Sequence, residues 1–172
     1  AAVVKANAYG LGVIPIVKAL DGAGCRTFFV ATLDEGIELR QITKHTIYVL
    51  NGISCEDPRE YQAYTLRPVL NDLDQIAIWR RYSDNTRLPP AAIHIDTGMN
   101  RLGLSQTLLA QSSKLENLYE NLDVSLIMSH LACADERHHE KNLDQLRRFQ
   151  SLISASKGIP ASLSASSGIF LG

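Results

Sequence analysis

Residues 3–12 read VVKANAYGLG, a stretch in which an apolar run ends abruptly in a lysine. Valine is typical of buried strands, whereas an unpaired ammonium group is costly to bury. Lys5 is therefore either the first solvated residue after a strand or a nucleophile held in a pocket. The choice between the two depends on what the rest of the chain builds around this lysine.

Short apolar runs of the same kind recur along the chain, and they are rich in β-branched and aromatic residues. The predicted strands are 1–4, 27–31, 46–50, 67–70, 91–95, 124–128 and 161–165. Helix-like stretches stand between several of them, at 13–24, 33–42, 73–82 and 142–158, the last expected to end in a glycine cap. Alternating strands and helices indicate parallel βαβ units, and the continuous apolar character of each strand indicates burial on both faces.

A polar or reactive residue follows each predicted strand. These residues are Lys5, Thr32, Asn51, Asn71 with Asp72, Asp96, His130 and Ser166. In a (β/α)8 barrel the active site is built at the C-terminal ends of the strands, although any strand taken alone must end in something polar. A closed barrel needs eight strands, and seven are counted here. We therefore predict an α/β fold, an incomplete (β/α)8 TIM-type barrel in one domain over 1–172.

Composition excludes several classes of partner. The chain has 172 residues, 45% of them hydrophobic, and its 17 basic and 18 acidic residues leave a net charge of −1. This balance offers no footprint for nucleic acid and no polybasic patch for a membrane surface, and no apolar stretch approaches the length of a membrane-spanning helix. Cys25, Cys55 and Cys133 are odd in number and form no CxxC pair, which is typical of reduced thiols in a cytoplasmic protein.

Three segments after strands carry candidate chemistry. In HIDTGMNRLG (94–103), glycines permit a tight turn that would project Arg101 over the barrel mouth, where a guanidinium binds oxyanions. SHLACAD (129–135) places His130 at the end of the sixth strand, although a lone histidine is more often structural. SASSG (164–168) offers hydroxyl and backbone N–H groups at a possible helix start, which suits an anion.

A metal site is the alternative interpretation of CADERHHE (133–140), where Cys, Asp, His and Glu residues crowd together. Adjacent histidines do not give the usual ligand spacing. A charged loop before the helix at 142–158 explains the cluster better, so we predict no metal.

The segments AVVKANAYG, ATLDEGIELR, DTGMNRLG, SHLACAD and SASSG, in this order, resemble the N-terminal barrel domain of the alanine racemase family, whose members are fold-type III pyridoxal 5'-phosphate (PLP) enzymes. The resemblance spans essentially all 172 residues but about half of the family's plan, without the last barrel strand and the following β-domain. It implies a cytoplasmic homodimer that interconverts L-alanine and D-alanine with PLP by a two-base mechanism and supplies D-alanine for cell-wall peptidoglycan.

The resemblance also implies roles for five residues. Lys5 would link PLP covalently and act as the base on one face of the substrate. Tyr9 and Ser166 would contact the cofactor phosphate. Arg101 would lie at the phenolic oxygen of PLP and bind the substrate carboxylate, and His130 would belong to the hydrogen-bonded network beside the second base.

Three positions depart from the family pattern. Leu11 replaces a histidine of the usual AYGHG motif, and Ser162 replaces a histidine that supports an arginine facing the pyridine ring. His94 stands where some members carry a carbamylated lysine that orients the arginine. Because histidine cannot be carbamylated in this way, something else must orient Arg101.

The second base is expected outside these residues, since in the family it is a tyrosine from the partner subunit's C-terminal domain. By themselves the 172 residues are therefore not expected to racemise alanine. The alternative is a non-catalytic PLP-binding regulatory protein of the same barrel fold, which would share the lysine strand but would not be expected to carry DTGMNRLG. Substrate breadth among small amino acids is not set by the sequence.

Overall fold

The computed structural model describes residues 1–53, 57–83, 87–111, 118, 120–154, 156, 158–163 and 165–171. Within these residues the strands form one seven-stranded sheet in which every neighbouring pair is parallel and the order in space follows the order in the chain. The strands are β1 (Ala2–Val3), β2 (Thr27–Val30), β3 (Thr46–Val49), β4 (Arg67–Leu70), β5 (Ala91–His94), β6 (Val124–Ser129) and β7 (Ala161–Leu163).

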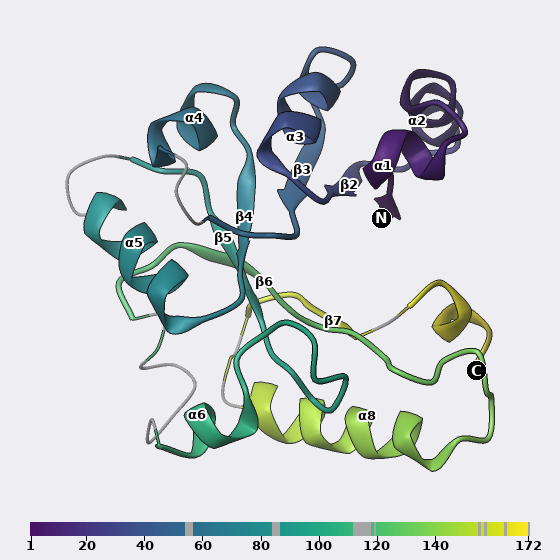
Figure 1. Ribbon diagram of the computed structural model, residues 1–172, viewed down its shortest axis with the longest axis vertical. Helices are drawn as coiled ribbons and strands as arrows, with labels where there is room; N and C mark the ends of the chain where they lie inside the picture. Colours follow the sequence, from purple (N-terminus) through teal and green to yellow (C-terminus); the bar gives the residue numbers. More distant parts are fainter. Residues whose placement is uncertain are drawn as a thin grey trace.

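The sheet is curled, with helices on its outer side, and the two ends of the chain both lie at the right of the view in Figure 1. This architecture is an incomplete (β/α)8 barrel, in which β1 and β7 are the two edges. All seven predicted strands and the predicted fold class are thereby confirmed.

The described helices are α1 (Lys5–Tyr9), α2 (Val13–Gly22), α3 (Leu33–Arg40), α4 (Pro58–Ala63), α5 (Leu73–Ser83), α6 (Gln106–Gln111), α8 (Glu140–Ile153) and the 3₁₀ turn η1 (Ser166–Phe170). The helices predicted at 13–24, 33–42 and 73–82 are confirmed. The short helices α4 and α6 were not predicted, because six residues do not establish a helical period.

The prediction that a glycine caps the end of the helix at 142–158 is wrong. The helix begins earlier, at Glu140, and ends at Ile153, five residues before Gly158. Ser154 caps it, and the Ser154 hydroxyl donates a hydrogen bond of 2.8 Å to the carbonyl of Ser151 in the last turn. A side chain that bonds the free carbonyls of a helix end replaces the usual glycine.

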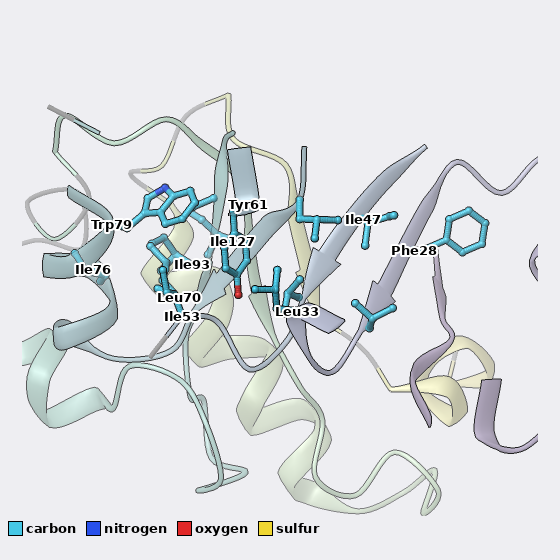
Figure 2. Close-up of a cluster of buried hydrophobic side chains, with 14 of the residues drawn as sticks. Phe28, Leu33, Ile47, Ile53, Tyr61, Leu70, Ile76, Trp79, Ile93 and Ile127 are labelled. Atoms are coloured by element: carbon cyan, nitrogen blue, oxygen red, sulfur yellow. The ribbon is translucent and has the colours of Figure 1, made fainter. Parts of the chain in front are cut away.

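The core lies on both faces of the sheet, because successive strand residues point to opposite sides. Figure 2 shows part of the outer cluster, where Phe28 and Ile47 of the strands lie in the same layer as Tyr61 and Trp79 of the helices. The rings of Tyr61 and Trp79 pack edge to face, with their centroids 5.5 Å apart. The inner cluster, which lines the barrel, consists of Phe29, Tyr48, Val69, Ala92, Leu126 and Met128. The predicted burial on both faces is confirmed for β2 to β6 and is wrong for the edge strands β1 and β7, which have a neighbour on one side only and keep exposed residues.

Two further expectations concern the cysteines and helices that could cross a membrane. Cys25 and Cys133 are free and half-buried, and Cys55 lies outside the described residues. Among the described helices, none combines the length and the apolar character that a membrane crossing requires.

Gly52, which follows β3, gives a test of this packing. Its φ of +68° is a left-handed conformation, and an added Cβ would lie 2.5 Å from the Val69 carbonyl oxygen. We expect Gly52→Ala to lower the free energy of unfolding by about 3 kcal/mol, because backbone strain and overpacking add together. Urea denaturation of the purified protein measures this loss.

Gly22→Ala serves as the control, because a Cβ at this position in α2 would meet nothing within 4 Å. It should be neutral or stabilising by up to about 1 kcal/mol. Equal denaturation midpoints for the two variants would contradict the packing described around Gly52.

Candidate functional site

Parallel strands in chain order bring all their carboxyl ends to one edge of the curled sheet. β1 ends at Val3, and Lys5 lies two residues further along the chain. His130 directly follows β6. Arg101 lies in the loop after β5, and Ser166 begins the 3₁₀ turn after β7. Tyr9 ends α1 and is 62% exposed.

The segment after Lys5 is a left-handed turn. Four consecutive residues, Ala6 to Tyr9, have φ between 50° and 55°, and Gly10 continues at 85°. Each non-glycine residue in this region costs about 1–2 kcal/mol, so a run of four is sustained only by surrounding contacts. The turn reverses the chain immediately after the lysine. It was not predicted, and the sequence holds only a partial signal in Asn7 and Gly10, because asparagine and glycine tolerate this conformation.

Hydrogen bonds within the segment close the turn. The Ala8 N–H donates to the Val4 carbonyl and the Gly10 N–H to the Ala6 carbonyl, each at 3.0 Å. The side-chain oxygen of Asn7 accepts from the N–H of Val13 at 2.8 Å, at the start of α2. The turn after Lys5 is therefore closed by bonds of its own backbone and by a bond to the beginning of the next helix.

The loop that carries Arg101 is organised by Asp96. One carboxylate oxygen of Asp96 accepts the backbone N–H groups of Gly98, Met99 and Asn100 at 2.9, 2.8 and 3.1 Å. The loop returns to the strand end through reciprocal backbone bonds, from the Asp96 N–H to Leu104 and from the Leu104 N–H to His94. Arg101 is exposed in this closed loop, and its predicted place over the barrel mouth stays a prediction.

His94 ends β5 and is only 9% exposed. The Asn71 amide donates to the carbonyls of Leu50 and Val69, so its oxygen faces the Nδ1 of His94 at 2.8 Å. Nδ1 therefore carries the proton, and Nε2 is left as an acceptor. Burial lowers the pKa of His94 to about 4, and nearby His130 and Arg101 act in the same direction while Asp96 opposes them. His94 is neutral at physiological pH.

His130 is half-buried, and its pKa is also lowered, first by burial and then by the positive charges of Arg101 and Lys5. Lys5, Arg101 and His130 all follow strands of the same parallel sheet, so they lie toward the same edge. The topology thus places three of the predicted site residues toward one edge of the sheet.

Gln145 of α8 holds the His130 segment in place, and it is only 1% exposed. Its amide nitrogen donates to the His130 carbonyl at 2.9 Å and to the Thr97 hydroxyl at 3.1 Å. Its oxygen accepts from the Ala132 N–H at 2.9 Å. Gln145 therefore connects the loop after β6 with the loop after β5. Sequence reasoning missed it, since a glutamine in a helix gives no signal of burial.

Ser166 borders a cavity of about 460 Å³, together with Ser167 and Arg137. The lining of this cavity does not include the other four predicted site residues. The hydroxyl groups and the guanidinium provide hydrogen-bond donors for an anion, and the Asp135 carboxylate also lines the cavity. The 3₁₀ turn at Ser166 agrees with the helix start expected from SASSG.

The CADERHHE segment forms turns that lead into α8. Nδ1 of His139 accepts from the Lys141 N–H at 3.1 Å, so His139 is the N-cap of that helix. Over the described part of the chain, no three His, Cys, Asp or Glu side chains gather in a group that could hold a metal ion.

Comparison with known proteins identifies relatives over the whole chain. Residues 1–172 match the family model described as alanine racemase, N-terminal domain. The chain is 46% identical to an alanine racemase of Rickettsia rickettsii over 99% of its own length and 49% of that protein, and 42% identical to one of Rickettsia bellii. The chain spans about half the length of the curated relatives it matches.

Solved structures agree with the sequence relatives. An alanine racemase from Bartonella henselae, described with covalently bound pyridoxal phosphate, superposes with a TM-score of 0.90 at 37% identity and covers all of this chain and 51% of its own. A histidine racemase from Leuconostoc mesenteroides superposes with a TM-score of 0.78 at 25% identity, over 98% of this chain and 46% of its own.

The lowered pKa of His94 predicts how stability depends on pH. Histidine in the unfolded chain titrates near 6.5, whereas His94 in the folded chain titrates at about 4. Between these values the unfolded state binds more protons, so stability falls as the pH drops from 6.5 to 4, by about 3 kcal/mol for this group. His94→Asn keeps a donor toward Asn71 and removes the titration, so denaturation midpoints measured across this range should fall less steeply.

His138→Asn is the control, because His138 is an exposed histidine and the change is chemically the same. It should leave the slope of stability against pH as in the parent protein. An unchanged slope in His94→Asn would show that His94 is not held neutral in the folded chain.

Proposed function

The chain belongs to the alanine racemase N-terminal domain family, and from this premise we propose that it forms the cofactor-binding barrel of a PLP-dependent alanine racemase. The observation that carries the proposal is Lys5, a half-buried lysine that begins α1 just after the first strand and acts electrostatically on His130. The family supports a racemase, which is an isomerase. The Bartonella relative described with covalently bound pyridoxal phosphate supports the cofactor.

The donor set of the site fits this cofactor. PLP needs an amine for its aldehyde carbon, and Lys5 offers one at a strand end. It also needs hydrogen-bond donors for its phosphate, and Ser166, Ser167 and Arg137 offer them in the lining of a cavity that also includes the Asp135 carboxylate. Tyr9 would add its hydroxyl group to the phosphate. When bound, PLP supplies an electron sink for the charge that develops as the substrate's α-proton leaves.

Residues of the chain would then bind the substrate and transfer its α-proton. Arg101, exposed on a loop held by Asp96, would bind the substrate carboxylate through its planar fork of donors. Lys5 would move the α-proton on one face of the substrate. Burial and the positive charges of Arg101 and Lys5 lower the pKa of His130, which favours the neutral ring that can both donate and accept in a hydrogen-bonded network.

Racemisation requires a base on each face of the same carbon. We infer that the second base belongs to a part of the whole protein outside these 172 residues, on a partner subunit of a homodimer. Without that base the 172 residues would not racemise alanine. The chain spans about half the length of its curated relatives, so dimerisation and a supply of D-alanine for peptidoglycan belong to this proposal about the whole protein.

Alanine is the proposed substrate, because the curated relatives at 42–46% identity are alanine racemases. The similar histidine racemase shares the barrel at lower identity, so this half of the fold accommodates enzymes named for different amino acids. The substrate class carried by the barrel itself is therefore an α-amino acid with a free carboxylate.

Chemical labelling tests the role of Lys5. Borohydride reduction of the protein in the presence of PLP should leave a stable pyridoxyl group on Lys5, because reduction traps the covalent link between an amine and an aldehyde. Peptide mass spectrometry identifies the labelled residue. Lys5→Ala should lose the label, whereas Lys18→Ala, which removes an exposed lysine of α2, should keep it. Label on Lys18 in place of Lys5 would refute the assignment.

Substitution of Arg101 tests carboxylate recognition. Arg101→Lys keeps the charge and loses the bidentate fork, so the KM for alanine should rise about tenfold in the whole enzyme. Steady-state kinetics in both directions measure it. Arg81→Lys, an exposed arginine at the end of α5, is the matched control and should leave the KM unchanged. An unchanged KM in Arg101→Lys would count decisively against the role.

A further inference from the structure

Glu35, in the first turn of α3, makes two contacts that the proposed chemistry does not use. One oxygen, Oε1, accepts the backbone N–H of Ala6 at 2.8 Å. The other, Oε2, accepts the backbone N–H of Ala31 at 2.7 Å. Ala6 directly follows Lys5, and Ala31 directly follows β2. A single carboxylate therefore joins the ends of two neighbouring strands, across 29 residues of sequence.

The bridge extends the pairing of β1 and β2 past the point where the strands separate. The last backbone bond between them runs from the Val4 N–H to the Phe29 carbonyl at 2.8 Å. Beyond it the chain after Lys5 enters the left-handed turn, so the Ala6 N–H cannot continue a regular ladder. The Glu35 carboxylate supplies the missing acceptor at the first residue of that turn.

Glu35 itself is held by its helix. Its backbone N–H donates to the hydroxyl of Thr32, the N-cap of α3. Leu33 and Leu39 of the same helix are buried in the core. The carboxylate is thus fixed to a packed element, and it can fix the peptide that follows Lys5.

We propose that Glu35 is a positioning residue for Lys5, which fixes the left-handed turn and thereby the direction in which the lysine side chain leaves β1. The inference rests on the proposed function in that Lys5 is taken to carry PLP. Glu35 is not offered as a proton-transfer group, because both of its oxygens are engaged with backbone donors. The two hydrogen bonds from Ala6 and Ala31 need a carboxylate as acceptor. An amide has one acceptor oxygen and would direct its NH₂ group at the second N–H.

The test compares Glu35→Gln with Glu38→Gln, the same change at an exposed position of the same helix. In the whole protein, titration with PLP followed by absorbance gives the apparent Kd. Glu35→Gln should raise it about tenfold, because one of two charge-assisted hydrogen bonds is replaced by two opposed donors. Glu38→Gln should bind PLP as the parent protein does.

Hydrogen exchange without PLP gives a second readout, which separates positioning from general destabilisation. In Glu35→Gln the amides of Ala6 and Ala31 should exchange faster, while amides of the buried strand β3 keep the parent rate. Faster exchange throughout the sheet would show a purely structural role and overturn the inference. So would a Kd and local exchange rates equal to those of Glu38→Gln.

Glu35→Asp covers the case in which the glutamine variant does not fold. It keeps the charge but is one methylene too short to reach both amides, so it should show the same local exchange and weaker PLP binding. Parent behaviour in Glu35→Asp would overturn the inference. If the parent itself places no PLP on Lys5, the proposed function fails, whereas the exchange of Ala6 and Ala31 still decides whether Glu35 holds the turn.

Discussion

The structure depends on one constraint, which is that the backbone groups at the ends of parallel strands must find partners where the ladder stops. In this chain, side chains from the following helices supply them. Glu35 accepts from the N–H of Ala31, and Gln75 accepts from the N–H of Asn71, each four residues before it. Gln145 does the same for Ala132 after β6. The segments that carry Lys5, Arg101 and His130 are therefore each attached to a packed helix.

This constraint explains why the polar residues after the strands have different roles. Thr32 is the N-cap of α3, Asp72 accepts the N–H of Gln75, and Asp96 closes the loop of Arg101. These polar residues hold the backbone, as strand ends require. Lys5 and His130 follow strands in the same way but carry ionisable groups that affect one another. A set of rigid strand ends thus surrounds a few reactive side chains, which is the arrangement that catalysis needs.

The hydrogen bond between His94 and Asn71 shows how a buried histidine is held in its neutral form near positively charged side chains. A charged His94 would add a positive charge to a buried position on which the Arg101 guanidinium already acts. The Asn71 amide, itself fixed by two carbonyls, keeps the proton of His94 on Nδ1 and leaves Nε2 as an acceptor. His94 is therefore held neutral in the interior by the hydrogen bond that it donates to a neighbouring strand end.

The sequence by itself determined the seven strands, their parallel order and the place of Lys5, His130 and Arg101 at their ends, because apolar periodicity and strand length are local properties. It also supplied the family through short motifs such as KANAYG and DTGMNRLG. Only the tertiary structure decided the left-handed turn, the bridge from Glu35 to Ala6, the tautomer of His94 and the buried position of Gln145. Three of these features join residues that are 23 to 48 positions apart in the sequence, and the turn depends on backbone dihedrals. A pattern of apolar and polar residues indicates neither distant contacts nor dihedral angles.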